Sequence, residues 1–225
     1  MPLNKQIGNM YPWITHTWNP IKGCNHDCIY CYVKDLARRY NYSLKPRFDE
    51  KELKINLGSG NKIFVGSTSD MFGYWIPDGW IKKILNYCEW DYPDNTYLFQ
   101  SKNPKRFHKF LENFPRNIIL GTTIETNYDF KWISKAPLSS DRKICIETLN
   151  DLTDIMISIE PVIDFDLKIM IRWMKDINPK FISMGADSKN HGLPEPSSDK
   201  IKKLITELNK FTEVKIKNNL NRLLK

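Results

Sequence analysis

Short runs rich in β-branched and aromatic residues alternate with longer amphipathic runs along most of the 225-residue chain. Such alternation is typical of βα units, whose strands pair side by side in a parallel sheet. The predicted strands cover residues 15–21, 62–66, 97–101, 118–123, 156–159, 181–185 and 213–216. The predicted helices cover residues 33–40, 78–90, 104–113, 139–150, 167–177 and 198–210. The pattern predicts an α/β fold and allows an open (β/α)6 partial barrel, a doubly wound sheet or an incomplete eightfold barrel.

The length of the chain fits one domain with a sizeable core, so we predict a single domain over residues 1–225. No apolar run is as long as a membrane span, and no membrane partner is expected. The polar stretch 41–61 is a candidate lid or insertion. The first residues, MPLNKQIGNMYPW, resemble neither a signal peptide nor a transit peptide, so the expected location is cytoplasmic.

The formal net charge is +8, and the isoelectric point is about 9.1. This balance favours an anionic partner, and DNA or RNA is the obvious one. A solvated surface in a sequence rich in Lys, Asn and Ile would give the same excess of lysine. Both interpretations stay open at this point.

Three cysteines, Cys24, Cys28 and Cys31, lie within the run GCNHDCIYCYV with the spacing C-x3-C-x2-C. A [4Fe–4S] cluster usually takes four thiolates, so a loop that offers three leaves one iron open to another ligand. A closed zinc site needs four ligands, which His26 or a distant residue would complete. A third interpretation is that the thiols are buried and their spacing is accidental. Disulfides are not expected, because the chain has five cysteines and no secretory signal.

The triplet, with Tyr30 just before its last cysteine, resembles the radical S-adenosylmethionine (radical SAM) superfamily. The run WNPIKGCNHDCIYCYV is similar to a phage- and prokaryote-associated branch of that superfamily. Further segments agree with this branch: VGSTSDMF, QSKNPKRF, LGTTIETN, ISIEPVIDF and ISMGADS. The resemblance spans about Trp13 to Lys217 and implies the partial (β/α)6 barrel. It also implies a cluster loop at residues 23–32, with a [4Fe–4S] cluster on the three cysteines and SAM on its open iron.

The activity that the resemblance implies is that of a radical SAM enzyme. The reduced cluster cleaves SAM to a 5′-deoxyadenosyl radical, which abstracts hydrogen from substrate, and an external electron donor supplies the electron. The basic charge and the phage-type resemblance suggest a nucleobase in DNA or RNA, either modified or repaired. Two alternatives are a radical SAM enzyme that acts on a small molecule or protein, and a non-catalytic zinc-containing module that binds nucleic acid.

The candidate site residues lie in the cysteine loop and where predicted strands end, because ligands of parallel sheets collect at that edge. The candidates for cofactor binding are Tyr30, Ser67, Asp70, Lys102, Thr123 and Glu125. By resemblance, the segment after the second strand, residues 66–70, accepts hydrogen bonds from the SAM amino group, although the common GGE motif is missing from this sequence. The end of the fourth strand is expected at the SAM ribose, and Lys102 is placed to pair with the SAM carboxylate. Tyr30 would form a wall beside the adenine.

The candidate catalytic residues are Glu160, which ends the fifth predicted strand, and Asp187, which follows the sixth. A carboxylate between an apolar strand and a proline needs a partner, and we expect substrate, SAM, Lys102 or Lys215 for Glu160. Each candidate also has a structural alternative. Tyr30 would simply pack on the barrel, Asp70 would cap a loop, and Lys102 would be solvated.

Overall fold

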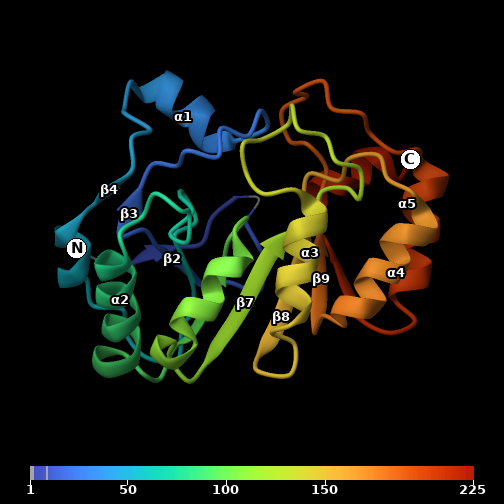
Figure 1. The fold of residues 1–225 in the computed structure, drawn as a ribbon. Coiled ribbons are helices and arrows are strands. Elements are labelled where there is room, and N and C mark those ends of the chain that lie inside the picture. Colours follow the sequence, from blue (N-terminus) through green and yellow to red (C-terminus); the bar gives the residue numbers. More distant parts are fainter. Residues whose placement is uncertain (1–2, 9) are drawn as a thin grey trace.

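The computed structural model describes residues 3–8 and 10–225 and has a mixed α/β architecture built on a parallel sheet (Figure 1). The main sheet has the strand order β1-β2-β5-β6-β7-β8-β9-β10, and each neighbouring pair from β2 to β10 is parallel. Its strands are β1 (Asn4–Lys5), β2 (His16–Trp18), β5 (Lys62–Val65), β6 (Thr96–Gln100), β7 (Ile118–Thr123), β8 (Asp154–Ile159), β9 (Phe181–Met184) and β10 (Glu213–Ile216). This arrangement confirms the predicted fold class.

A second, two-stranded sheet pairs β3 (Ile21–Lys22) with β4 (Arg47–Phe48). It brackets the cysteine loop and the helix that follows it. The stretch 41–61, expected as a lid or insertion, contains β4 and the short 3-10 helix η1 (Glu50–Lys54).

Five α-helices are α1 (Tyr32–Tyr40), α2 (Asp78–Asn86), α3 (Ser139–Glu147), α4 (Leu167–Ile177) and α5 (Ser198–Leu208). Helix α4 shows why the chain is helical there: the Asp166 carboxylate accepts a hydrogen bond from the Ile169 amide (2.9 Å) at its start, and Asn178 ends it with a left-handed φ of 48°. Helix α1 stands apart from the others, above the ends of the strands (Figure 1). Among the described residues, no helix is long and apolar enough to cross a membrane.

Two of the predicted helices are present but are not α-helical throughout. The segment Pro104–Asn113 is the 3-10 helix η3, and the predicted helix 78–90 ends as an α-helix at Asn86 and continues as the π-helical turn η2 (Tyr87–Asp91). In η2, Tyr87 packs on Trp18 with ring centres 5.4 Å apart and donates to the Ile55 carbonyl (3.0 Å). These tertiary contacts are absent from the local pattern. A final 3-10 helix, η4 (Asn218–Leu223), follows β10.

The outer face of the sheet packs against the helices α2 to α5 and buries most of the apolar core. The inner face carries a second apolar cluster of residues from five neighbouring strands: Phe64, Leu98, Ile119, Met156 and Phe181. Tyr11 and Ile14, which precede β2, are buried in the same cluster, and Trp13 packs against it. The segment before β2 therefore covers the inner face near the start of the strands.

Alternation along the strands turns the same inner face polar toward its other end. Two residues after Leu98 comes Gln100, two after Met156 comes Ser158, and two after Phe181 comes Ser183. The Tyr11 hydroxyl joins the two zones, because it donates to Gln100 Oε1 (2.8 Å) and lies 3.0 Å from Ser158 Oγ. The inner face therefore has an apolar floor and a polar rim at the carboxyl ends of the strands.

We predict that Tyr11→Ala destabilises the protein by about 3–5 kcal/mol, because it removes a buried ring that stacks on Phe64 and Trp13. Tyr11→Phe keeps the ring and loses only the hydroxyl contacts, so it should cost about 1–2 kcal/mol. Urea unfolding followed by circular dichroism measures both values. Equal costs for the two variants would contradict the packing role of the ring.

Candidate functional site

The cysteine loop, residues 23–32, connects β3 to the start of α1 at the carboxyl ends of the strands. Gly23 opens it with a left-handed φ of +81°, and a Cβ placed there would lie 2.4 Å from the Leu44 carbonyl oxygen. Only glycine is compatible with both conditions. The Cys24 amide then donates to the same Leu44 carbonyl (3.1 Å), which fixes the first cysteine against the segment before β4.

A second segment, residues 126–138 after β7, braces the loop from another side. The Ile29 amide donates to the Ile133 carbonyl (2.9 Å), and the Lys135 amide donates to the His26 carbonyl (2.6 Å). Ser134 Oγ lies 3.1 Å from Cys28 Sγ. The backbone around the second cysteine is therefore held by hydrogen bonds to a segment a hundred residues further along the chain.

His26, between the first two cysteines, is buried and pairs with buried Asp70, with Nε2 2.7 Å from Oδ2. Asp70 accepts three further hydrogen bonds, from Ser101 Oγ (2.7 Å), the Lys102 amide (2.9 Å) and the Phe72 amide (3.0 Å). Burial alone would raise the pKa of Asp70, but the hydrogen bond and charge of His26, with the other donors, hold it below its ordinary value. Asp70 thus joins the ends of β5 and β6 to the cysteine loop.

The cysteine thiols are free, and Cys28 is buried. Burial raises the pKa of both Cys24 and Cys28; nearby Asp70 adds to the shift at Cys24, whereas Lys102 opposes it at Cys28. Among residues 3–8 and 10–225, no three His, Cys, Asp or Glu side chains already converge on a single-ion position. Ligands of a multi-iron cluster need no such convergence, because each thiolate binds a different iron.

Glu125, just after β7, lies buried among partners from three segments. It pairs with Lys102 and accepts a hydrogen bond from Tyr30, both through Oε1, and its Oε2 lies 2.8 Å from Arg142 Nη1 of α3. Burial would raise the pKa of Glu125, but the charges of Arg142 and Lys102 outweigh it and hold the pKa at about 2. Three predicted site residues, Tyr30, Lys102 and Glu125, are therefore in direct contact.

Ser67 and Thr123 lie at strand ends and have protein partners. Ser67 Oγ donates to Asn19 Oδ1 (3.1 Å), and its carbonyl accepts from the Tyr32 hydroxyl of α1 (2.8 Å). Thr123 is buried and accepts from Gln100 Nε2 (3.0 Å). Both residues belong to the polar rim around the cysteine loop.

Glu160 lies beside a cation that we did not predict. Its Oε2 is 2.8 Å from Lys217 Nζ, so the partner is Lys217 rather than Lys102 or Lys215. Asn219 Nδ2 donates to the other carboxylate oxygen (3.3 Å). A Cβ on Gly185 would lie 2.8 Å from that oxygen, so glycine on β9's extension makes room for the carboxylate.

Asp187 occupies a separate position, in the loop after β9. It accepts from His191 Nδ1 (2.7 Å) and from the His191 backbone amide (2.5 Å). His191 Nε2 lies 3.7 Å from Asp35 of α1, and Lys189 Nζ lies 3.1 Å from the same carboxylate. This loop therefore contacts the helix that follows the cysteines.

Sequence reasoning missed Arg142, Lys217 and Asn19. Lys217 carried a usable signal, because it continues the alternation of Glu213 and Lys215 onto the inner face. Arg142 lies in an amphipathic helix, where an arginine is ordinarily on the solvent side, and no local pattern marks it as the partner of Glu125.

The family model described as "Protein of unknown function (DUF5131)" matches residues 9–174. The chain belongs to the DUF5131 family. No curated protein matches the sequence.

Solved structures share the fold of this DUF5131 protein at low sequence identity. A point mutant of spore photoproduct lyase is 9% identical with a TM-score of 0.66, over 96% of this chain and 80% of that one. A spore photoproduct lyase double mutant with bound AdoMet and dinucleoside spore photoproduct is 12% identical with a TM-score of 0.56, over 92% and 64%. Streptococcus suis SuiB bound to the precursor peptide SuiA is 10% identical with a TM-score of 0.58, over 89% and 48%. At these identities the likeness establishes the fold.

Asp70→Ala should destabilise the protein by about 3–5 kcal/mol, because it leaves four buried donors without their acceptor. It should also speed amide hydrogen exchange in residues 23–31, since His26 loses its anchor. Exchange mass spectrometry measures the second effect. Asp151→Ala, at an exposed position, serves as the control and should change stability by no more than about 0.5 kcal/mol. Unchanged exchange in the loop of Asp70→Ala would refute the anchoring role.

The contribution of Glu125 to the free energy of unfolding should depend on pH. The Glu125 carboxylate is ionised in the folded protein down to about pH 2, against an ordinary pKa of 4.5. Its stabilising contribution is therefore complete above about pH 4.5 and is lost as the pH falls toward 2. Glu125→Gln leaves Arg142 without its counter-charge and should cost about 3–5 kcal/mol at pH 7.

Urea unfolding of wild type and Glu125→Gln at several pH values measures that cost. The difference between the two should shrink between pH 4.5 and pH 2.5. Glu112→Gln, at an exposed position, should show little difference at any pH. A cost of Glu125→Gln that is independent of pH would contradict the assignment.

Proposed function

We propose that this DUF5131 protein is a radical SAM enzyme whose [4Fe–4S] cluster is held by Cys24, Cys28 and Cys31. The observation that carries the proposal is a loop of three free thiols, braced at the carboxyl edge of a parallel sheet. The shared fold with spore photoproduct lyase and SuiB supports it, since a structure of the former contains bound AdoMet. The proposed domain covers the whole chain, with the cluster loop at 23–32.

The donor set fits a three-cysteine cluster better than a closed zinc site. A closed zinc site needs four ligands on one ion, and among the described residues no three His, Cys, Asp or Glu side chains converge on such a position. Cys88 is buried in the main core, and Cys145 lies on α3. Three thiolates without a fourth protein ligand leave an iron coordination position for a small molecule.

A small pocket lies beside the loop. This pocket of about 20 Å³, partly open to solvent, is lined by residues that include Glu125, Ile133, Ser134 and Arg142. Ser134 also contacts Cys28. The pocket therefore lies between the cysteine loop and the charged group around Glu125, and at this size it has room for about one water molecule.

Bound to Cys24, Cys28 and Cys31 and given an electron by an external donor, the cluster with SAM would supply the chemistry of reductive SAM cleavage and of hydrogen-atom abstraction from substrate, with methionine and 5′-deoxyadenosine as products. The residues of this chain bind and orient. Lys102, Glu125 and Arg142 carry one net positive charge, which suits the SAM carboxylate, with Lys102 as its partner. Tyr30 would flank the adenine.

Other predicted cofactor contacts take narrower roles. Thr123 and Glu125 lie where the resemblance places the ribose, and Ser67 lies beside α1. Asp70 already accepts four hydrogen bonds, which favours a positioning role through His26 over direct contact with SAM.

On the substrate side, we assign Glu160 and Asp187. Glu160 is paired with Lys217, and together they offer a hydrogen-bond acceptor and donor on the inner face. The net charge of +8 favours a nucleobase in DNA or RNA as substrate. SuiB has the same fold and was solved with a precursor peptide, so a peptide or protein substrate is the alternative.

The test is cleavage of SAM without substrate. Anaerobically reconstituted and dithionite-reduced protein should bind about four iron atoms per chain and release 5′-deoxyadenosine and methionine. Cys28→Ala should lose the brown absorbance and the product together. Cys145→Ala is the matched control, because it removes a thiol outside the loop, and it should keep both.

Two outcomes would overturn the proposal. One is a colourless protein that retains zinc after attempted cluster loading, which would favour the zinc-containing binding module. The other is a wild-type protein with a full cluster that releases no 5′-deoxyadenosine.

A further inference from the structure

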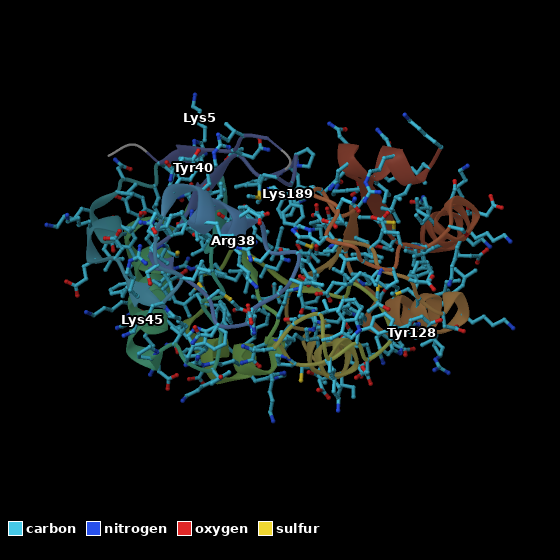
Figure 2. The ribbon with its side chains drawn as sticks, turned by 90° about the horizontal axis from the view of Figure 1, so that it is seen from above. Lys5, Arg38, Tyr40, Lys45, Tyr128 and Lys189 are labelled. Atoms are coloured by element: carbon cyan, nitrogen blue, oxygen red, sulfur yellow. The ribbon has the colours of Figure 1, made fainter. Side chains whose placement is uncertain are left out.

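Positive charge is concentrated in the segment that follows the cysteine loop. Residues 32–47 contain five basic residues and one acidic residue, which is four of the eight net positive charges of the chain. This segment comprises α1 and the stretch that leads to the start of β4. Figure 2, which looks down on this side of the molecule, labels Arg38, Tyr40 and Lys45 there.

The pairing of these charges distinguishes the segment from other lysine-rich parts of the chain. Near the C-terminus, Lys210, Lys215 and Lys217 each pair with a glutamate. By contrast, Arg39 and Lys45 have no carboxylate within 4.0 Å among the described residues. Both side chains belong to exposed residues.

The acidic residue of the segment does not cancel this charge. Asp35 lies 3.1 Å from Lys189 Nζ and 3.8 Å from Arg38 Nη1, so cations already surround it. The neighbouring lysine and these contacts hold the pKa of Asp35 below its ordinary value. The surface around Arg39 and Lys45 therefore presents net positive charge to solvent.

Exposed aromatic rings accompany these cations. Tyr40 is 63% exposed, and Tyr42 is 39% exposed although its hydroxyl donates to the Val33 carbonyl (3.3 Å). The Arg39 guanidinium lies 5.4 Å from the centre of the Tyr40 ring. In a single-stranded nucleic acid the phosphates would contact the cations and the bases would stack on the tyrosine rings. An acidic peptide would contact the cations but would have no bases to stack on the rings.

This surface adjoins the cysteine loop. Helix α1 begins at Tyr32, directly after Cys31, and the Tyr32 hydroxyl holds the helix to the Ser67 carbonyl at the end of β5. A polymer bound along α1 would therefore run beside the three cysteines.

We propose that Arg38, Arg39, Tyr40, Tyr42 and Lys45, the α1 surface, bind single-stranded nucleic acid and bring it to the cysteine loop. The proposed function supplies the reason for this binding, and on that function the inference rests. It names the substrate class as a nucleic acid with unpaired bases. Duplex DNA keeps its bases stacked inside the helix, so the exposed tyrosines have less to contact there.

The experiment is fluorescence anisotropy with a 16-nucleotide labelled single strand, as DNA and as RNA of the same sequence, at several salt concentrations. Arg39→Ala/Lys45→Ala should raise Kd on the order of tenfold in low salt and reduce the slope of log K against log salt by about 1.4. Lys202→Ala/Lys203→Ala is the matched control: both lysines are exposed on α5, and Kd should be unchanged.

Tyr40→Ala separates stacking from charge, because it removes a ring and leaves every cation. It should raise Kd about tenfold, and Tyr40→Phe should restore wild-type binding. Polyglutamate serves as the acidic-peptide probe. Duplex DNA of equal length serves as the probe whose bases are already stacked and paired. Circular dichroism of each variant shows whether the fold is kept.

Several outcomes would overturn the inference. They are equal weakening by the α5 control, no effect of Tyr40→Ala, or tighter binding of polyglutamate or duplex than of the single strand. Wild-type protein that releases 5′-deoxyadenosine but binds no single strand refutes this inference alone. Wild-type protein that binds the strand through α1 but cleaves no SAM refutes the proposed function and leaves the surface assignment standing.

Discussion

The hydrogen bond between His26 and Asp70 joins the cysteine loop to the sheet, and the rest of the site depends on it. A carboxylate buried in a protein is costly unless donors surround it, and Asp70 meets four. Those donors come from the cysteine loop, from the turn after β5 and from the end of β6. Because a single side chain satisfies all of them, the loop cannot shift without breaking contacts at two strand ends.

The same principle organises the other carboxylates at the carboxyl edge of the sheet. Glu125 is compensated by cations from β6's end and α3, and Glu160 by Lys217 after β10. Asp187 is compensated by His191 of its own loop. The partners of Glu125 and Glu160 lie on other segments, so these charges hold together elements that are distant in sequence. The order of the strands brings them together.

The sequence predicts the architecture well because its signals are local. The alternation of β-rich and amphipathic runs gives the strand β7 and the helix α4 with their observed bounds, and inner-face alternation places Thr123 and Glu125 at one strand end. Partners across the sheet are not local. Alternation along β10 puts Lys217 on the inner face, but neither its pairing with Glu160 nor the pairing of Arg142 with Glu125 follows from a pattern along the chain, because these contacts depend on how the elements are ordered in space.

Stability alone does not explain the ion pair between buried Lys217 and half-buried Glu160. Removing two charges from water costs about as much as their attraction returns, and apolar residues of similar size would serve a core as well. Yet Gly185 leaves room for the carboxylate, and Tyr11 places its ring 5.0 Å from the ammonium. A pair held this way can exchange one partner for a polar group of a ligand at little net cost, because each charge keeps a second contact. Its position at the polar rim of the inner face is where a substrate that reaches past the cysteine loop would meet it.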